Sequence, residues 1–293
     1  MSTIKSLAVG SGDMFYIRHG SDNFSIIDCC LADESREGIV EEIKRASEDK
    51  GIVRFISTHP DEDHLRGLRY LDQRINLRNF YCTKNDVIKE DESEDFKHYC
   101  TLRDSEKAFY IRRGRKRKWM NEDSDERGGS GISIVWPVVE NEHYKDALVL
   151  AEKGGSPNNT SAVIKYSLTN GVSFLWMGDL ETEFMEHIAD AIPWPKVDVV
   201  FAAHHGRSSG RIPHSILDQL KPRMIVLGEA PSRHLHYYGG YNTLTQNTLG
   251  DITFECKEGK VHVFVSEEGC EVGFLDDEGV TGGDHYVGTL NLI

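Results

Sequence analysis

The chain has 293 residues, 39% of them hydrophobic, and a formal net charge of −14. This length fits one large α/β domain or two small ones, and this hydrophobic content excludes a disordered chain. The acidic balance works against general nucleic-acid binding at long range, although a local basic surface can still attract a polyanion.

Nothing in the sequence predicts a membrane or secreted protein. No apolar run is long enough to cross a bilayer, and residues 1–9 lack the basic and apolar regions of a signal peptide. The six cysteines form no C-x-x-C pair and no disulfide-like spacing. We therefore expect a cytoplasmic protein with no membrane partner.

The N-terminal part of the chain predicts strands followed by alternating helices and strands. Three short strands separated by glycines form a β-meander, at residues 4–9, 14–18 and 24–28. A helix is expected at residues 36–47, a buried strand at 52–57 and a further helix at 65–71.

Residues 72–131, approximately, differ from the rest by their high charge and weak periodicity. Two acidic runs lie on either side of a basic run at residues 112–118, and the segment ends in a glycine-rich stretch. We interpret it as a charged, partly helical surface insertion and not as a separate domain.

Regular structure is predicted again after residue 131. Strands are expected at residues 132–136, 162–167, 172–176, 197–202, 224–227, 252–255 and 261–265, and helices at 181–191 and 214–220. The order of elements predicts an α/β fold in which two mixed sheets pack face to face with helices outside. We expect residues 1–293 to form one such domain.

The densest group of potential metal ligands follows the strand at residues 52–57. His59-x-Asp61-x-Asp63-His64 places four ligands within six residues. Imidazole nitrogens suit zinc and related metals, and carboxylates suit manganese or magnesium. A charged helix cap on a solvated loop is the alternative interpretation, but four ligands at this spacing favour a metal site.

Two further segments end in polar residues after a predicted strand. Gly178-Asp179 alone would be read as a turn and helix cap. His204-His205-Gly206 alone is ambiguous between a buried histidine and a ligand. The order of the three segments is more informative than any one of them.

This order resembles the metallo-β-lactamase superfamily, and within it the hydrolase domain of the competence DNA-uptake channel proteins (ComEC-type). Further segments share the resemblance, at residues 9–13, 26–28, 157–163 and 204–209. Most superfamily members have a histidine at the position of Asp61 and another before the Gly-Asp pair. Competence-type proteins share both departures, and their transmembrane channel has no counterpart in this chain.

The resemblance implies two divalent metal ions, zinc or manganese, with magnesium as a further candidate. His59 and Asp61 would bind one ion, in a ligand-poor site. Asp63, His64 and one histidine of the 204–205 pair would bind the other, with Asp179 as the bridge. We favour His205 because adjacent strand residues point to opposite sides. The implied catalytic residues are Asp63, Asp179 and His204, the last as a proton donor.

Substrate contacts are expected from three places. Asn159 and Ser161 support either the site or the substrate, or form only a polar turn. His236 either lines the pocket or belongs to a surface loop. The basic run, with Arg113, Arg115 and Lys116, either holds a polyanion or is a solvated surface that pairs with the acidic runs.

These observations favour a phosphodiesterase or nuclease acting on nucleic acid, DNA above all, through a metal-activated hydroxide. The alternatives are hydrolysis of a small phosphoester, either a cyclic nucleotide or a phosphocholine-type ester, and a binding or regulatory subunit with little turnover. Asp61 disfavours a lactam or thioester hydrolase.

Overall fold

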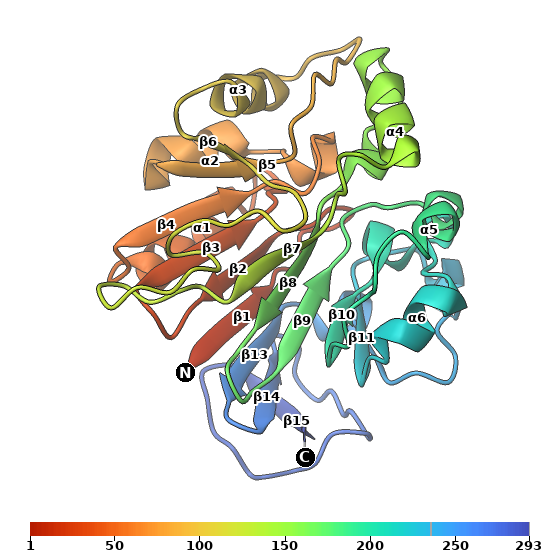
Figure 1. Cartoon of the computed structure of the whole chain (residues 1–293). Helices are drawn as coiled ribbons and strands as arrows, with labels where there is room; N and C mark the ends of the chain where they lie inside the picture. Colours follow the sequence, from red (N-terminus) through yellow and green to blue (C-terminus); the bar gives the residue numbers. More distant parts are fainter. Residues whose placement is uncertain (235, 293) are drawn as a thin grey trace.

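Two mixed β-sheets pack face to face, and helices cover both outer faces (Figure 1). The computed structural model describes residues 1–234 and 236–292. The arrangement is the αββα sandwich that the order of elements predicted, so the predicted fold class is confirmed.

The first sheet has nine strands, of which four neighbours run parallel. From edge to edge they are β15 (His285–Asn291), β14 (Lys260–Val265), β13 (Ile252–Lys257), β1 (Ser2–Ser6), β2 (Phe15–Arg18), β3 (Asn23–Ile27), β4 (Ile52–Ile56), β5 (Asn79–Cys82) and β6 (Ala108–Tyr110). Because β3 to β6 are parallel, the loops that follow them lie at the same edge of the sheet.

The second sheet has six strands and repeats this combination of antiparallel and parallel pairs. In order they are β12 (Thr243–Thr245), β11 (Met224–Leu227), β10 (Val199–Phe201), β9 (Ser173–Trp176), β8 (Val163–Ser167) and β7 (Ile132–Trp136). Strands β9 to β12 are parallel, so the segments that follow β9 and β10 also meet at one edge.

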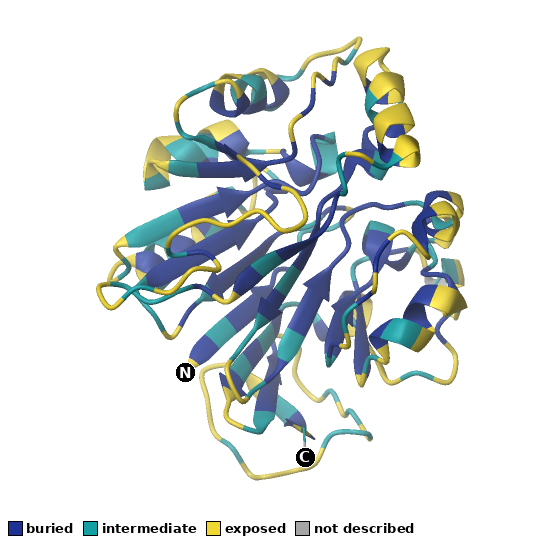
Figure 2. Ribbon diagram, in the orientation of Figure 1, coloured by how far each residue is buried: buried dark blue, intermediate teal, exposed yellow. Residues whose placement is uncertain are grey.

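Three hydrophobic layers hold the sandwich together, and the strands are its most buried part (Figure 2). Aromatic side chains fill the space between the sheets, where Phe15 packs on both Trp176 and Phe201. The first sheet is covered by α1 (Arg36–Ser47), α2 (Leu68–Ile75) and α3 (Glu94–Arg103). The second is covered by α4 (Glu142–Glu152), α5 (Thr182–Ile188) and α6 (His214–Leu220), and α7 (Gln246–Leu249) is a single turn after β12.

The segment 72–131 is more closely integrated than the sequence predicted. Strands β5 and β6 extend the first sheet, and Tyr81, Phe109 and Met120 are buried in the core. The expectation of a surface insertion is therefore wrong for this part. The charged residues beside these two strands hid their apolar residues.

Within the described residues, no helix combines the length and the apolar character needed to cross a bilayer. All six cysteines are free, in line with the absence of disulfide-like spacing.

Candidate metal centre

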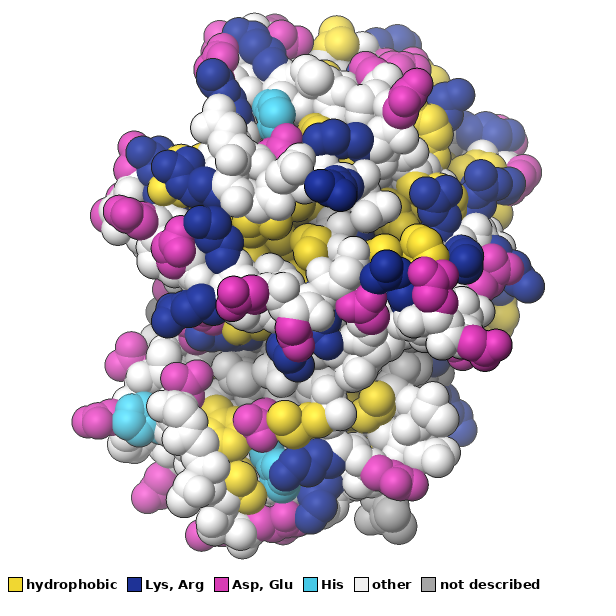
Figure 3. Space-filling model, turned by 90° about the vertical axis from the view of Figure 1, so that its left-hand side faces the viewer, with side chains coloured by type: hydrophobic (Ala, Val, Ile, Leu, Met, Phe, Trp, Pro, Cys, Tyr) yellow, Lys and Arg dark blue, Asp and Glu magenta, His cyan; other side chains and the backbone are white. Residues whose placement is uncertain are grey.

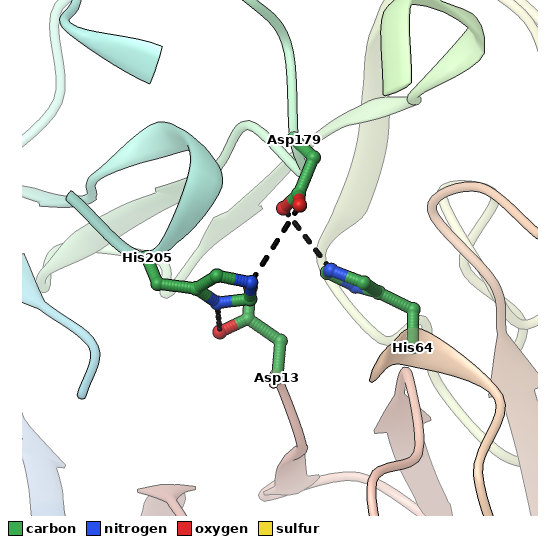
Figure 4. A group of neighbouring side chains, drawn as sticks. All are labelled: Asp13, His64, Asp179 and His205. Carbon is green, nitrogen blue, oxygen red and sulfur yellow. Dashed lines mark hydrogen bonds and ion pairs between the residues drawn. The ribbon is translucent and has the colours of Figure 1, made fainter. Parts of the chain in front are cut away.

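Four loops from the two sheets bring polar side chains to one point (Figure 4). Asp13 lies between β1 and β2, and His64 lies in a 3-10 turn, Glu62–His64, after β4. Asp179 follows β9, and His205 lies in the turn Ala203–Gly206 after β10. One potential ligand atom from each of these residues lies within 4.8 Å of the others.

Asp179 is at the centre of this group, because imidazoles from two loops face its carboxylate. Its Oδ1 lies 3.0 Å from His64 Nε2. Its Oδ2 lies 3.5 Å from His205 Nε2 and 3.6 Å from His204 Nε2. Asp63 contacts the same imidazole of His205, with its Oδ2 3.4 Å from Nε2.

The atoms that point into this space make no hydrogen bond of good geometry among the described residues and face one another instead, with His64 Nε2 3.0 Å from Asp179 Oδ1. Nε2 of His59, His64 and His205 and Oδ1 of Asp179 are all buried and unsatisfied. Leaving such atoms unpaired is costly, and their convergence from both sheets is the arrangement that a divalent cation satisfies.

The far nitrogens of the two central histidines are held by carboxylates. His64 Nδ1 lies 2.9 Å from Asp28 Oδ2, and His205 Nδ1 lies 2.9 Å from Asp13 Oδ1. Metal-binding histidines typically donate their second nitrogen in this way, which fixes the ring and leaves Nε2 free for the metal. The residues present therefore fit a divalent metal ion.

Opposite charges at close range decide the protonation of the centre. Burial alone would lower the pKa of His64, but Asp179 and Asp28 outweigh it and raise the pKa well above its ordinary value. Burial would also lower the pKa of His205, but Asp13 and Asp179 outweigh it and raise this pKa to about 10. Burial would raise the pKa of Asp63, but the neighbouring His205 and His64 outweigh it and lower the pKa to about 2. Without a metal, protons on the histidines therefore compensate the carboxylates.

Glycines allow the loops to approach so closely. A Cβ on Gly12 would lie 2.5 Å from the backbone oxygen of Asp63. A Cβ on Gly178 would lie 2.7 Å from Ser161 Oγ, and Gly178 has a φ of 54°. A side chain at either position would push apart the loops that carry the predicted ligands.

The turn that carries the two adjacent histidines is strained. His204 has a φ of 52° and His205 a φ of 56°, both in the left-handed region that residues other than glycine rarely adopt. The pair lies beyond the end of β10, so the expected alternation of a strand does not apply, and both rings approach Asp179. His205 is buried, whereas His204 is partly exposed.

Asp61 and His59 lie beside this group, but Asp61 is engaged elsewhere. Asp61 Oδ1 accepts a hydrogen bond from Lys89 Nζ at 2.6 Å. Burial would raise the pKa of Asp61, but the ion pair with Lys89 outweighs it and lowers the pKa. The His59 ring lies 4.2 Å from that of His64, centroid to centroid, and burial and His64 lower its pKa to about 4. The place predicted for a second ion is thus less completely formed.

Asn159 and Ser161 form hydrogen bonds that stabilise the loops around the centre. Ser161 is fully buried, and its Oγ accepts a hydrogen bond from the backbone nitrogen of Asp179 at 3.0 Å. Asn159 exchanges two hydrogen bonds with Glu181, which precedes α5. The sequence left open whether these residues support the site, contact the substrate or form only a polar turn. Their contacts match the first of these roles.

The remaining predicted substrate contacts are exposed. His236 lies in the loop before β12. The basic run with Arg113, Arg115 and Lys116 follows β6, and Lys118 forms its only ion pair within the described residues, with Glu126 at 3.8 Å. The expected pairing with both acidic runs is therefore limited to that one contact.

Asp13 and Asp28 are the site residues that sequence reasoning did not assign. Both belong to segments that carried the resemblance, but their role depends on contacts with His205 and His64, far away in the chain. Asp28 also accepts hydrogen bonds from the backbone nitrogen and hydroxyl of Thr58, at 2.7 and 2.6 Å. Asp28 therefore orients a predicted ligand and fixes the segment before it.

A search of curated proteins agrees with the motif-based resemblance. The chain is similar to ComE operon protein 3. It is 29% identical to that protein, from Bacillus subtilis (strain 168), over 91 residues. The match covers 30% of this chain but only 12% of the relative. No family model matches the chain.

A search of solved structures gives a metallo-β-lactamase, DIM-1. The match has 16% sequence identity and a TM-score of 0.30, and it covers 57% of this chain and 59% of the enzyme. At this level the comparison adds nothing about the reaction, which has to be argued from the site itself.

Proposed function

We propose that the protein is a metal-dependent phosphodiesterase that acts on nucleic acid, with DNA as the favoured substrate. The observation that carries the metal dependence is the convergence of His64 Nε2, His205 Nε2 and Asp179 Oδ1, which are all buried and face one another without a hydrogen bond of good geometry. The abundance of carboxylates beside them, and the resemblance to the competence-type proteins, favour a phosphodiester over a lactam.

Asp63, His64, Asp179 and His205 would hold the ion. When bound there, a divalent cation lowers the pKa of water and offsets the negative charge that develops on a phosphoryl group. Asp13 and Asp28 keep the two imidazoles oriented through their Nδ1 atoms. Asp179 would also reach a second ion through its other oxygen.

His204 is placed to move a proton at the edge of the centre. Its Nδ1 lies 2.9 Å from Ser209 Oγ, and its Nε2 faces Asp179. In the doubly protonated ring, Nδ1 donates to the hydroxyl of Ser209 and Nε2 carries the second proton, so that loss of the Nε2 proton leaves a neutral imidazole. We infer that this proton is donated to the leaving oxygen.

We propose unequal affinities for two ions. The ion near His64 and His205 would bind tightly. An ion held by His59 and Asp61 would bind weakly, because Asp61 has to leave the ammonium group of Lys89. Manganese suits this oxygen-rich position better than zinc.

A screen of metals against substrates tests the proposal. Chelated protein is supplied with zinc, manganese or magnesium and is given single-stranded DNA, duplex DNA, RNA and bis(p-nitrophenyl) phosphate. We expect manganese or zinc to restore hydrolysis of the diester and of DNA. Hydrolysis by metal-free protein at the full rate, or none with any metal, would contradict the proposal.

Hydrolysis of a small phosphoester is the second candidate function, and the net charge of −14 favours it. On the face seen in Figure 3, Lys and Arg side chains are interspersed with Asp and Glu, so no broad basic surface lies there. A cyclic nucleotide or phosphocholine-type ester would need only a local contact. Turnover of such an ester together with failure to cleave any polynucleotide would favour this candidate.

A further inference from the structure

Three arginines lie on the loops that adjoin the predicted ligand His205. Arg207 follows two residues after His205, and its backbone nitrogen donates to the carbonyl oxygen of His204 at 2.8 Å. Arg211 is four residues further along the same segment, and Arg233 lies in the loop between β11 and β12. All three are therefore attached to the part of the chain that forms one wall of the centre.

The two loops are fixed to each other by tyrosines. Tyr237 donates from its hydroxyl to the carbonyl oxygen of Ile212 at 3.1 Å. The hydroxyl of Tyr238 accepts from the backbone nitrogen of Ile212 at 3.2 Å. The Arg211 guanidinium carbon lies 4.9 Å from the centre of the Tyr237 ring. These contacts hold the loop that carries Arg233 against the turn that carries His204.

None of the three arginines is neutralised within the described residues. No carboxylate there lies within 4.0 Å of the guanidinium groups of Arg207, Arg211 or Arg233. Nε of Arg207 and of Arg211 is buried and has no hydrogen-bond partner. Desolvation and the charges of Arg233, Arg207 and Arg211 all lower the pKa of His234, in keeping with the closeness of the three cations.

Among the described residues, most arginines without a carboxylate partner are exposed, whereas Arg207 and Arg211 are half-buried. A buried or half-buried cation without a carboxylate calls for an anion from outside the chain. Guanidinium groups bind phosphate oxygens through paired hydrogen bonds, so phosphate is the anion that fits best.

The basic run at residues 112–118 does not offer the same contact. Its later residues, Arg115 to Lys118, line a cavity together with Ile52 and Asn79, the first residues of β4 and β5. His59 follows the other end of β4, and the ends of this five-residue strand are roughly 13 Å apart. The run thus lies toward the edge of the sheet away from the centre.

We propose that Arg207, Arg211 and Arg233 bind a phosphate that neighbours the scissile one in a polynucleotide strand. This inference rests on the proposed function and assigns its substrate contact. It replaces the basic run as the site of polyanion binding and reconciles a polynucleotide substrate with an acidic protein, because the positive charge is local to the centre.

Binding of a dye-labelled single-stranded oligonucleotide by fluorescence anisotropy tests the proposal. For the Arg211→Gln/Arg233→Gln variant we expect Kd to rise about tenfold and its salt dependence to flatten, as loss of charge-assisted phosphate contacts requires. Arg211→Lys/Arg233→Lys should recover part of the affinity, because the charge remains. The ratio of kcat/KM for the oligonucleotide to that for bis(p-nitrophenyl) phosphate should fall in parallel.

Arg45→Gln is the matched control, because Arg45 is an exposed cation in the last turn of α1, which leads to the start of β4. We expect it to leave Kd and its salt dependence unchanged. An equal loss in this control, or a loss confined to serine substitutions at Arg113, Arg115, Lys116 and Arg117, would overturn the proposal.

Two further outcomes separate this inference from the proposed function. Displacement of the oligonucleotide by a mononucleotide at equal concentration would assign the arginines to a single phosphate and would overturn the polynucleotide contact. Failure of the wild-type protein to hydrolyse bis(p-nitrophenyl) phosphate with any metal would contradict the proposed function, whereas the binding comparison would still decide the role of the arginines.

Discussion

Asp179 contacts more histidines than any other carboxylate of the centre. Its two oxygens face His64 on one side and His204 and His205 on the other. Burial alone would raise the pKa of Asp179, but His64 and His205 outweigh it and lower the pKa well below its ordinary value. The carboxylate is therefore ionised at neutral pH and ready to bind a cation.

Replacing Asp179 by alanine should abolish catalysis without unfolding the protein. Loss of the carboxylate shared by the predicted sites should reduce kcat at least about a hundredfold and lower the metal content. Asp190→Ala is the control, since Asp190 is an exposed carboxylate shortly after α5. Turnover and metal content close to wild type in Asp179→Ala would refute the assignment.

The substitution Asp28→Asn should distinguish the role of Asp28 in orienting His64 from its role in folding. The amide keeps the size of the side chain but no longer offers two anionic oxygens to His64 Nδ1 and to Thr58. We expect metal affinity to fall about 10- to 100-fold, as at comparable carboxylate–histidine pairs. Metal titration and thermal unfolding of the metal-free protein measure the two effects separately, and unaltered metal affinity with a reduced Tm would make Asp28 purely structural.

The stability of metal-free protein should fall as the pH rises above neutrality. The folded-state pKa of His205 is about 10, above its value of about 6.5 in an unfolded chain. Its protonation therefore stabilises the fold fully below pH ~6.5, and this contribution is lost as the pH approaches 10.

A bound metal replaces those protons, so its presence should remove this loss. Tm measured from pH 7 to pH 10 should decline for chelated protein and should decline less for metal-loaded protein. Parallel curves for the two forms would contradict the assignment of His205 to the metal.

At the level of elements, the sequence predicts best where charged runs do not interrupt the apolar pattern. The helix expected at 36–47 coincides with α1, and the strands expected at 132–136 and 224–227 coincide with β7 and β11. Strands β5 and β6 escaped prediction because they lie in a segment rich in charged residues. The histidine pair was assigned to a strand end, although it lies in a left-handed turn whose strain depends on tertiary contacts.

The candidate site likewise has a part that the sequence predicts and a part that it does not. Segments 59–64, 178–179 and 204–205 were predicted from local ligand density and chain order, and the fold brings them together. The ion pair of Asp61 with Lys89 and the bracing by Asp13 join residues far apart in sequence. Such pairs leave no local pattern, so a single sequence could not reveal them.

Gly12→Ala tests the close approach of the β1–β2 loop to the metal-binding segment. A Cβ there would lie 2.5 Å from Asp63 backbone oxygen and from Cys30 Sγ, so one of the loops has to move. We expect a loss of about 1–3 kcal/mol in the free energy of unfolding, together with weaker metal binding.

Gly38→Ala is the matched control, because Gly38 lies within α1 and has no atom within 4 Å of an added Cβ. It should stabilise the protein by about 0.5–1 kcal/mol. Equal effects of the two substitutions in denaturant unfolding would show that the Gly12 contact carries no strain.

At the scale of the whole molecule, the net charge of −14 is unevenly distributed. On the face seen in Figure 3 the cations are interspersed with carboxylates, whereas Arg207, Arg211 and Arg233 have no carboxylate partner among the described residues. Net charge is thus a poor guide to the field at the site, because nearby groups dominate it and distant ones are screened by salt.

The central claim is that the cluster of Asp63, His64, Asp179 and His205 binds a divalent cation on which hydrolysis of phosphodiesters depends. Titration of chelated protein with manganese or zinc tests it most directly, with bound metal per chain and bis(p-nitrophenyl) phosphate hydrolysis followed in the same samples. We expect the rate to rise with bound metal and both signals to vanish in Asp179→Ala. Hydrolysis that is independent of bound metal, or metal that binds equally well to Asp179→Ala, would contradict the account.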